Sequence, residues 1–315
     1  MPSVISPEQW LLEVKSKAPQ VRKSFRAMYS SWVGGIVTDP ALMLVPVDDH
    51  QFHRGDGVFE AIKFINSRIW LLQPHLQRLL RSASALSLQM PFSVQELESI
   101  ILETCRVSGL SDGLIRVFLS RGPGSFSVNP YDTLGPQLYV VVTELPPVPE
   151  SKFRNGVRAG RSSIPVKEPW LAQTKTCNYL PNVMMKKEAV DRGLDFVVGE
   201  FNEKFTEGPT ENLILLNENN ELIKPCPDRI LAGTTMSRIF ELAGACREIR
   251  GLKTRDFGLR EILLAKEVMV VGTTIDVLPV VEFEGHRIGD GTPGPVSKEL
   301  LELIRRDQQQ GAKFV

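Results

Sequence analysis

The sequence has few cysteines and few histidines, and neither type is arranged to bind a metal ion. None of the cysteines forms a C-x-x-C pair, and the histidines are scattered along the chain. These absences argue against a zinc site and against a disulfide scaffold, so we expect no bound metal and a reducing compartment. The residues concerned are Cys105, Cys177, Cys226, Cys246, His50, His53, His75 and His286.

The sequence also lacks a long apolar run and an excess of charge of either sign. Lys and Arg together number 37, as do Asp and Glu, so no net field draws nucleic acid or an anionic membrane to the chain. No run approaches the roughly 20 apolar residues that cross a bilayer. We therefore expect a soluble protein that binds small polar molecules, with neither nucleic acid nor a membrane as a partner.

No targeting segment is visible at the N-terminus. The first residues, MPSVISPEQW, contain neither the apolar core of a secretory signal nor an Arg-rich transit pattern. This composition favours the cytoplasm. The stroma of a plastid, such as a chloroplast, is the alternative if a presequence has been removed.

Several common functional motifs are missing as well. The G-x-S-x-G nucleophile turn, the Walker A loop and the Rossmann fingerprint are all absent. The tripeptide Arg54-Gly55-Asp56 resembles an adhesion signal, but nothing else in the sequence supports secretion. We interpret it as a tight turn before a strand.

The residues that are present can build a sizeable core. Of the 315 residues, 42% are hydrophobic and 23% are charged, which suggests roughly two domains. Residues 145–150 contain three prolines and disfavour both helix and central strand, so this segment is the expected linker. We place the domains at residues 1–148 and 149–315.

The hydrophobic pattern mixes strands and helices in both halves, without regular βαβ alternation, and so favours an α+β fold. In the first half it predicts a short helix within residues 8–30, a helix from about Gln73, and a hairpin turn at Asn66-Ser67. Strands are expected at residues 41–47, 57–65, 68–72, 114–119 and 137–143. In the second half strands are expected at residues 157–162, 196–198, 212–216 and 267–271, and helices at residues 181–192, 235–245 and 295–306.

Lys175 lies in a polar turn, Thr174 to Leu180, just before one of these helices. A lysine amine attacks a carbonyl only when it is neutral, so a Schiff-base lysine must be desolvated or placed near positive charge. Lowering its pKa by three units corresponds to about 4 kcal/mol. The alternative, a solvated surface lysine, stays open on this segment alone.

Glu207 follows a strand and precedes a glycine turn, in the segment Thr206 to Asn212. In a pyridoxal enzyme, a carboxylate beside the ring nitrogen keeps that nitrogen protonated and lets the ring accept electrons. A Glu-Gly turn with asparagine is also common at protein surfaces.

Two turns place glycine before a pair of threonines, at residues 233–235 and 272–274. The first leads into a helix, so backbone N–H groups and hydroxyls there could hold a phosphate at the positive end of the helix dipole. The alternative is simple capping, since threonine is a good N-cap residue. A phosphate site also favours an arginine, and Arg78 is a candidate unless it is an exposed helix residue.

Taken in order, these segments resemble the fold-type IV pyridoxal phosphate enzymes, which include D-amino acid transaminases, branched-chain aminotransferases and aminodeoxychorismate lyases. The resemblance spans roughly residues 30 to 290 and depends on the order of six motifs. They are residues 54–60 (similar to GDGVFE), 75–79 (H-x-x-R-L), 175–180 (K-x-x-N-Y-L), 206–212 (T-E-G-x-x-x-N), 231–235 and 272–280.

The resemblance implies a two-domain α+β fold that binds pyridoxal 5'-phosphate between its domains and forms a homodimer. It implies Lys175 as the internal aldimine and proton shuttle, with Glu207 on the pyridine nitrogen. Tyr179 would contact the phenolic oxygen of the ring. The remaining cofactor-binding residues implied are Arg78, Asn212, Gly233, Thr234, Thr235, Gly272 and Thr273.

The implied reaction is transamination between an amino acid and a 2-oxo acid by a ping-pong mechanism through aldimine and ketimine, with no metal required. The strand of residues 57–63 resembles D-amino acid transaminases most, which makes D-amino acids the leading substrates. Several of those enzymes bind the substrate carboxylate with an R-x-H trio after a T-R-G strand end. Here Ser120-Arg121-Gly122 keeps the strand end, but Phe126-Ser127-Val128 replaces the trio. The substrate-binding residues expected instead are Arg54, Phe59, Ala61 and Thr274.

Three other functions stay open. Aminodeoxychorismate lyases use the same cofactor chemistry to release pyruvate, and branched-chain L-aminotransferases share a segment like EGPTEN around Glu207. A protein that binds pyridoxal phosphate without catalysis is the third, and the presence of both Lys175 and Glu207 argues against it.

Overall fold

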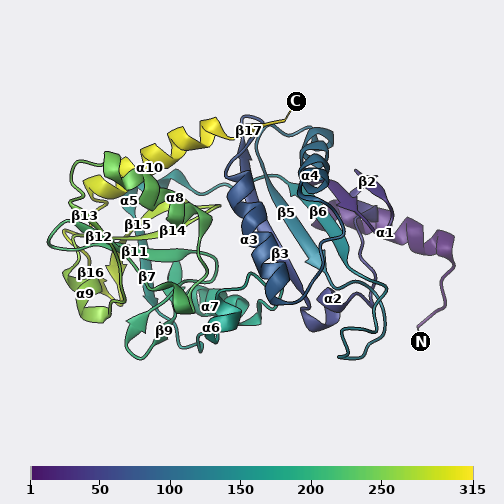
Figure 1. Ribbon diagram of the computed structural model, residues 1–315, viewed down its shortest axis with the longest axis horizontal. Helices are drawn as coiled ribbons and strands as arrows, with labels where there is room; N and C mark the ends of the chain where they lie inside the picture. The colour runs from purple at the N-terminus through teal and green to yellow at the C-terminus, as the bar shows by residue number, and fades with distance from the viewer. Residues whose placement is uncertain (1, 315) are drawn as a thin grey trace. The chain divides into compact units, whose positions relative to one another are not determined.

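The computed structural model describes residues 2–314 and divides the chain into two compact units (Figure 1). The first unit contains the residues up to Leu145, Thr176–Asn178 and the residues from Gly311 onward. The second contains Pro146–Lys175 and Tyr179–Gln310. Each unit is therefore built from segments that are separated in the sequence, whereas the linker argument predicted two contiguous domains.

The first unit is built on an antiparallel sheet with the strand order β17-β4-β3-β5-β6-β1-β2. Its longest strand, β3, pairs with β5 from Gly57 opposite Ser120 to Phe64 opposite Gly113. The strands are β1 (Phe25–Ser30), β2 (Gly35–Val37), β3 (Gly57–Ile65), β4 (Arg68–Ile69), β5 (Gly113–Ser120), β6 (Gln137–Thr143) and β17 (Ala312–Lys313).

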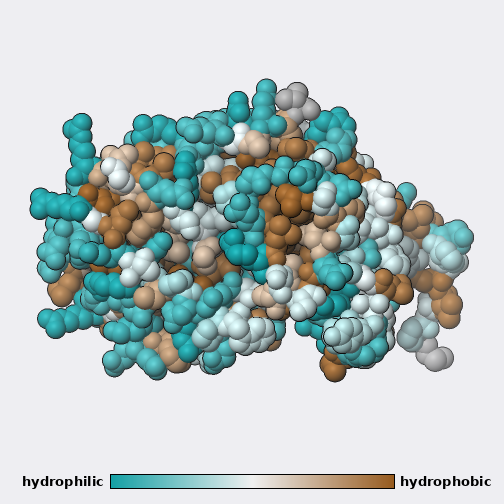
Figure 2. Space-filling view, viewed as in Figure 1, coloured by the Kyte–Doolittle hydropathy of each residue, from teal (hydrophilic) through white to brown (hydrophobic). Residues whose placement is uncertain are grey.

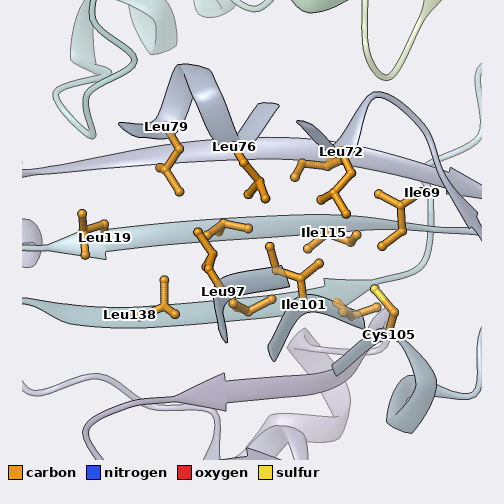
Figure 3. Packing of buried hydrophobic residues seen from close by; sticks show 14 of the residues in the cluster. Ile69, Leu72, Leu76, Leu79, Leu97, Ile101, Cys105, Ile115, Leu119 and Leu138 are labelled. Carbon is orange, nitrogen blue, oxygen red and sulfur yellow. The ribbon is translucent and has the colours of Figure 1, made fainter. Parts of the chain in front are cut away.

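Two helices, α3 (Leu72–Ala85) and α4 (Val94–Ser108), pack on one face of this sheet. Figure 3 shows Leu76 and Leu79 of α3 and Leu97 of α4 directed at Ile115 and other strand residues. Helix α4 was not predicted from the sequence. Its signal was the Ser93-x-x-Glu96 capping box, in which each residue's side chain bonds the other's backbone N–H.

The hairpin between β3 and β4 was predicted correctly, and its geometry explains why. Asn66 and Ser67 have φ values of 50° and 56°, the positive angles that a two-residue turn of this kind requires. The second strand is shorter than expected because Leu71 also adopts a positive φ of 55° and α3 begins at Leu72.

The prediction of a strand at residues 41–47 was wrong. The 3-10 helix η1 (Pro40–Leu42) begins there, with Asp39 accepting a hydrogen bond from the Ala41 N–H. The residues that follow form no strand, and Pro46 has no N–H to donate to a neighbouring strand. The predicted turn at Arg54-Gly55-Asp56 is the end of α2 (His50–Arg54), where Gly55 has a φ of 67°.

The second unit is built on a mixed sheet with the order β13-β12-β11-β14-β15-β7-β8. Its apolar residues, including Leu213, Val270 and Leu278, form a core separate from that of the first unit. The strands are β7 (Val157–Arg161), β8 (Phe196–Val198), β11 (Asn212–Leu216), β12 (Glu221–Lys224), β13 (Gly251–Thr254), β14 (Glu267–Gly272) and β15 (Asp276–Phe283), and the short β16 (His286–Arg287) pairs with β15.

Three longer helices belong to this unit: α7 (Leu180–Asp191), α8 (Thr234–Leu242) and α10 (Pro295–Asp307). The mixture of sheets and helices confirms the α+β prediction. No helix within residues 2–314 combines the length and the apolar character that crossing a membrane requires. The remaining elements are α1 (Pro7–Val21), α5 (Glu150–Asn155), α6 (Pro169–Ala172), α9 (Leu259–Leu264), β9 (Glu200–Phe201), β10 (Lys204–Phe205), η2 (Pro227–Arg229), η3 (Ala243–Ala245) and η4 (Gln308–Gln310).

The packing of α4 on the sheet of the first unit can be tested by substitution. Leu97 is fully buried, whereas Val94 on the same helix is 37% exposed. We expect Leu97→Ala to lower the free energy of unfolding by about 2–5 kcal/mol, because it leaves a cavity. The matched change Val94→Ala should stay within about 0.5 kcal/mol. Urea unfolding followed by tryptophan fluorescence measures both, and equal effects would contradict the packing described.

Candidate active site

Lys175 lies in the segment between α6 and α7, and its amine approaches a tyrosine four residues further along the chain. The Nζ atom is 3.3 Å from the Tyr179 hydroxyl oxygen and 5.7 Å from the centroid of the Tyr179 ring. Tyr179 is the N-cap residue of α7, which begins with a proline in its first turn. The start of the helix therefore fixes the position of the phenol that accompanies the lysine.

Two hydrogen bonds hold the Glu207 carboxylate, one from a backbone N–H and one from a side-chain amide. Its Oε2 accepts a hydrogen bond from the Leu231 N–H at 2.9 Å and one from the Asn212 side-chain amide at 3.4 Å. The same amide nitrogen donates to the Leu231 carbonyl at 3.0 Å. Asn212, the first residue of β11, therefore connects Glu207 to the loop that precedes α8.

The electrostatic state of Glu207 is unusual for a carboxylate. Burial raises the pKa of Glu207 to about 7, although the Leu231 hydrogen bond and the charges of Lys167 and Lys175 act in the opposite direction. The residue keeps part of its surface accessible, but its carboxylate lies deep among protein atoms. A small change in its surroundings therefore decides whether it is charged at neutral pH.

Lys167 is a residue of this site that the sequence analysis missed. Its Nζ lies 5.1 Å from the centroid of the Tyr179 ring. Burial lowers the pKa of Lys167, and the charge of Glu207 opposes that effect. No motif marks this lysine, because it lies in an irregular segment eight residues before Lys175 and approaches Glu207 only through the fold.

The first glycine-threonine turn fits a phosphate group. Gly233 is the N-cap residue of α8 and makes no side-chain capping bond, and the Thr235 hydroxyl is buried without a hydrogen-bond partner among residues 2–314. A Cβ atom at Gly233 would lie 1.9 Å from the Asn212 Oδ1, so a residue with a side chain would clash with Asn212 at this position. The buried hydroxyl and the N–H groups at the start of α8 suit an anion with several oxygen atoms.

The second turn, Gly272 to Thr274, connects β14 to β15. The Ile275 N–H donates to the Gly272 carbonyl at 3.2 Å, and Asp276 adopts a φ of 55° as β15 begins. Thr273 and Thr274 are partly exposed. The structure thus shows a tight hairpin at these residues, and their predicted contacts with phosphate and substrate stay predictions.

Arg78 lies on α3 in the first unit and forms a buried ion pair. Its Nε and Nη2 atoms donate to the two carboxylate oxygens of Glu60, each at 2.7 Å, and the His75 Nδ1 lies 2.7 Å from the same carboxylate. Burial alone would raise the pKa of Glu60, but the charge and hydrogen bonds of Arg78 and His75 lower it to about 2. Arg78 is therefore a positioned buried cation rather than an exposed helix residue.

The residues predicted to bind substrate in the first unit lie on α2 and β3. Arg54 is exposed and donates hydrogen bonds to the carbonyls of His53 and Phe126. Phe59 stacks on Phe118 of β5, with ring centroids 5.9 Å apart. Neither arrangement tests the predicted role.

Arg116 was also missed by the sequence analysis. It is paired in register with Ala61 and is half-buried, and its guanidinium has no hydrogen bond or ion pair within residues 2–314. Burial lowers the pKa of Arg116. The signal was available, since a single arginine interrupts the otherwise apolar strand of residues 114–119.

The raised pKa of Glu207 predicts a pH dependence of stability. Because the folded carboxyl holds its proton more tightly than the unfolded one, folding loses stability as pH rises from about 4.5 to about 7. We expect Glu207→Gln to remove this loss, up to about 3 kcal/mol. Urea unfolding of the cofactor-free protein at about pH 5 and about pH 8 measures the difference.

The control is Glu188→Gln on α7, where hydrogen bonds from Ser162 and Ser163 outweigh burial and lower the pKa of Glu188. This variant should lose about the same stability at both pH values, because the pH dependence of a carboxyl with a lowered pKa lies below about pH 4.5. A Glu207→Gln protein with the same pH dependence as the original chain would show that Glu207 has an ordinary pKa.

The chain matches the family model of amino-transferase class IV over residues 57–283. It is 38% identical over 302 residues to a chloroplastic D-amino-acid transaminase of Arabidopsis thaliana, covering 93% of this chain and 79% of the relative. It is 30% identical over 265 residues to a D-alanine aminotransferase of Bacillus licheniformis, covering 83% of this chain and 90% of the relative.

Solved structures of the same kind superpose on the chain. A branched-chain amino acid aminotransferase of T.th., solved with pyridoxamine 5'-phosphate, aligns with a TM-score of 0.84 and 25% identity, covering 91% of this chain and 95% of that one. The 4-amino-4-deoxychorismate lyase of Pseudomonas aeruginosa aligns with a TM-score of 0.76 and 25% identity, covering 89% and 98%. The chain therefore belongs to the class IV amino-transferases, the fold-type IV enzymes whose cofactor is pyridoxal 5'-phosphate.

Proposed function

We propose that the chain transfers amino groups between D-amino acids and 2-oxo acids, with Lys175 as the residue that carries pyridoxal phosphate. The observation that carries the proposal is the arrangement of Lys175, Tyr179 and Glu207 in the second unit. It places a lysine amine at hydrogen-bonding distance from a phenol and within electrostatic range of a buried carboxylate. The preference for D-amino acids is supported by the two D-specific relatives.

The cofactor, when bound, supplies an aromatic ring that accepts electrons from the α-carbon of the substrate. Lys175 provides the amine that links covalently to the cofactor and, once released as the neutral amine, moves a proton at its Nζ atom. The Tyr179 hydroxyl orients that amine. Because the Leu231 N–H and the Asn212 amide fix its Oε2, Glu207 can hold the protonated ring nitrogen without rearrangement.

The phosphate group would lie at the N-terminus of α8. Gly233 leaves room there for the Asn212 side chain, Thr234 and Thr235 begin the helix, and the buried Thr235 hydroxyl has a hydrogen bond to offer. Gly272 and Thr273 are the further phosphate residues of the proposal. Arg78 is its cation, and the Glu60 carboxylate keeps that guanidinium oriented.

The substrate carboxylate requires a cation, and the first unit offers two arginines for that role. Arg54 is exposed at the end of α2, and Arg116 presents a half-buried guanidinium without a partner among the residues described. A buried guanidinium that lacks an anion gains most from binding a carboxylate. Phe59, Ala61 and Thr274 complete the proposed substrate residues.

A homodimer is part of the proposal, and exposed apolar surface supports it. Phe126, Val128, Tyr131 and Leu134 lie in one loop of the first unit and are 61% to 91% exposed. Helix α1 also exposes Leu12, and Figure 2 shows hydrophobic residues near the N-terminal end of the chain. Apolar side chains gathered in this way mark surfaces that bind another protein. The chloroplast is the proposed location, after the name of the Arabidopsis relative.

Two alternative functions follow from the solved structures that align with the chain. One is a lyase and the other a branched-chain aminotransferase. Release of pyruvate without an added 2-oxo acid would identify the lyase. Strict dependence on a 2-oxo acid acceptor would identify a transaminase.

The substrate preference is tested by following the cofactor absorbance while D- and L-amino acids are added one at a time. We expect D-alanine and other D-amino acids to change the spectrum at low concentration and their L-enantiomers to change it weakly. The control is the same panel on Lys175→Ala, which should show no change. A response to branched L-amino acids alone would make the D-specific proposal wrong.

The role of Lys175 is tested by reducing the protein with borohydride, which makes the covalent link to the cofactor permanent. We expect the labelled peptide to contain Lys175, and Lys175→Ala to lower the rate at least about a hundredfold. Label on Lys186 or Lys187 of α7, or on Lys167, would contradict the assignment.

A further inference from the structure

Two lysines lie against one tyrosine in the second unit. The Nζ atoms of Lys167 and Lys175 are 5.1 Å and 5.7 Å from the centroid of the Tyr179 ring. The Lys175 amine also lies at hydrogen-bonding distance from the Tyr179 hydroxyl, at 3.3 Å. The two amines therefore share one aromatic neighbour.

Lys167 is also the leading positive charge that Glu207 experiences. The charged groups with the largest effect on the pKa of Glu207 are Lys167, Lys175 and Glu211, in that order. Glu211 acts against ionisation, because it is a second buried acid close by. Since burial favours the neutral acid, the cations decide how much of Glu207 is charged.

The proposed function removes one of these two cations. Lys175 must be neutral to form its link with the cofactor and to accept a proton, so its positive charge is not continuously available to Glu207 during the reaction. The proposed function assigns no such link to Lys167, which can remain charged. It is then the lysine left to balance the buried carboxylate.

We propose that Lys167 is a positioning residue that keeps Glu207 negatively charged, so that this carboxylate can pair with the protonated ring nitrogen of pyridoxal phosphate. This inference rests on the proposed function. Lys167 acts through Glu207 and performs no chemical step of its own. A purely structural lysine would instead contribute only packing on an aromatic ring, as Lys224 does on Phe240, with 4.6 Å between its Nζ and the ring centroid.

The first measurement is the protonation midpoint of Glu207 in the full chain without cofactor. Difference infrared spectroscopy isolates this carboxyl when Glu207→Gln is the reference. We compare the original chain with Lys167→Met, which removes the charge, and Lys167→Arg, which keeps it. Lys224→Met is the matched control for loss of a lysine from an aromatic ring.

We expect a midpoint near pH 7 for the original chain, for Lys167→Arg and for Lys224→Met. In Lys167→Met the midpoint should move to higher pH by roughly one pH unit, because an attracting charge has been lost. An unchanged midpoint in Lys167→Met, or an equal shift in Lys224→Met, would overturn the proposal. Thermal unfolding shows that each variant is folded before it is titrated.

The second measurement compares the binding of pyridoxal phosphate with that of its 1-deaza analogue, in which carbon replaces the ring nitrogen. At neutral pH the preference for pyridoxal phosphate should fall by up to about tenfold in Lys167→Met and return in Lys167→Arg. An unchanged or increased preference in Lys167→Met would also count against the proposal.

The two measurements separate this inference from the proposed function. The infrared titration needs neither cofactor nor substrate. If the original chain transaminates no D-amino acid while its Glu207 midpoint still depends on Lys167, the proposed function fails and the electrostatic link stands. If the chain transaminates D-amino acids but the protonation midpoint of Glu207 does not change in Lys167→Met, only the inference about Lys167 is wrong.

Discussion

One buried carboxylate dominates the electrostatics of the candidate site in the second unit. Glu207 is costly to ionise where it lies, and its pKa is raised for that reason. The Leu231 N–H and the Asn212 amide orient it, and two lysines supply positive charge. A carboxylate that is fixed in place and balanced between charged and neutral can respond to the protonated ring of a cofactor. The loop before α8 and the start of β11 are arranged around this requirement.

The first unit contains a second buried carboxylate with the opposite electrostatic state. Glu60 is fully buried, but Arg78 and His75 bond it directly and hold its pKa near 2. The difference lies in the distance and number of the cationic partners, since direct charge-assisted hydrogen bonds outweigh burial. Glu60 is therefore charged at neutral pH, whereas the charge of Glu207 changes near neutral pH.

Local patterns predicted many of the helices and strands, but not β1, β15 or α4, and they named several residues of the candidate site. The alternation along β3, the Asn66-Ser67 turn and the proline at the start of α7 are local signals, and the structure places elements at each of them. The prediction of a strand at residues 41–47 was wrong because Asp39 and Pro40 start a 3-10 helix there. The hydrophobic pattern does not distinguish such a helix start from a strand. Lys167 and Arg116 were not predicted as site residues, because the neighbours that give them their interest are distant in the sequence.

The sequence by itself determined the residue types of the site and their order: a lysine before a helix, a glutamate before a glycine turn, and glycine ahead of paired threonines. These are local requirements of backbone geometry and reactivity, so they are written in short segments. Only the tertiary structure decided the charge on each group. The ionisation of Glu207 depends on burial and on Lys167, forty residues earlier in the chain, because electrostatic energy depends on distance in space and on the surrounding medium.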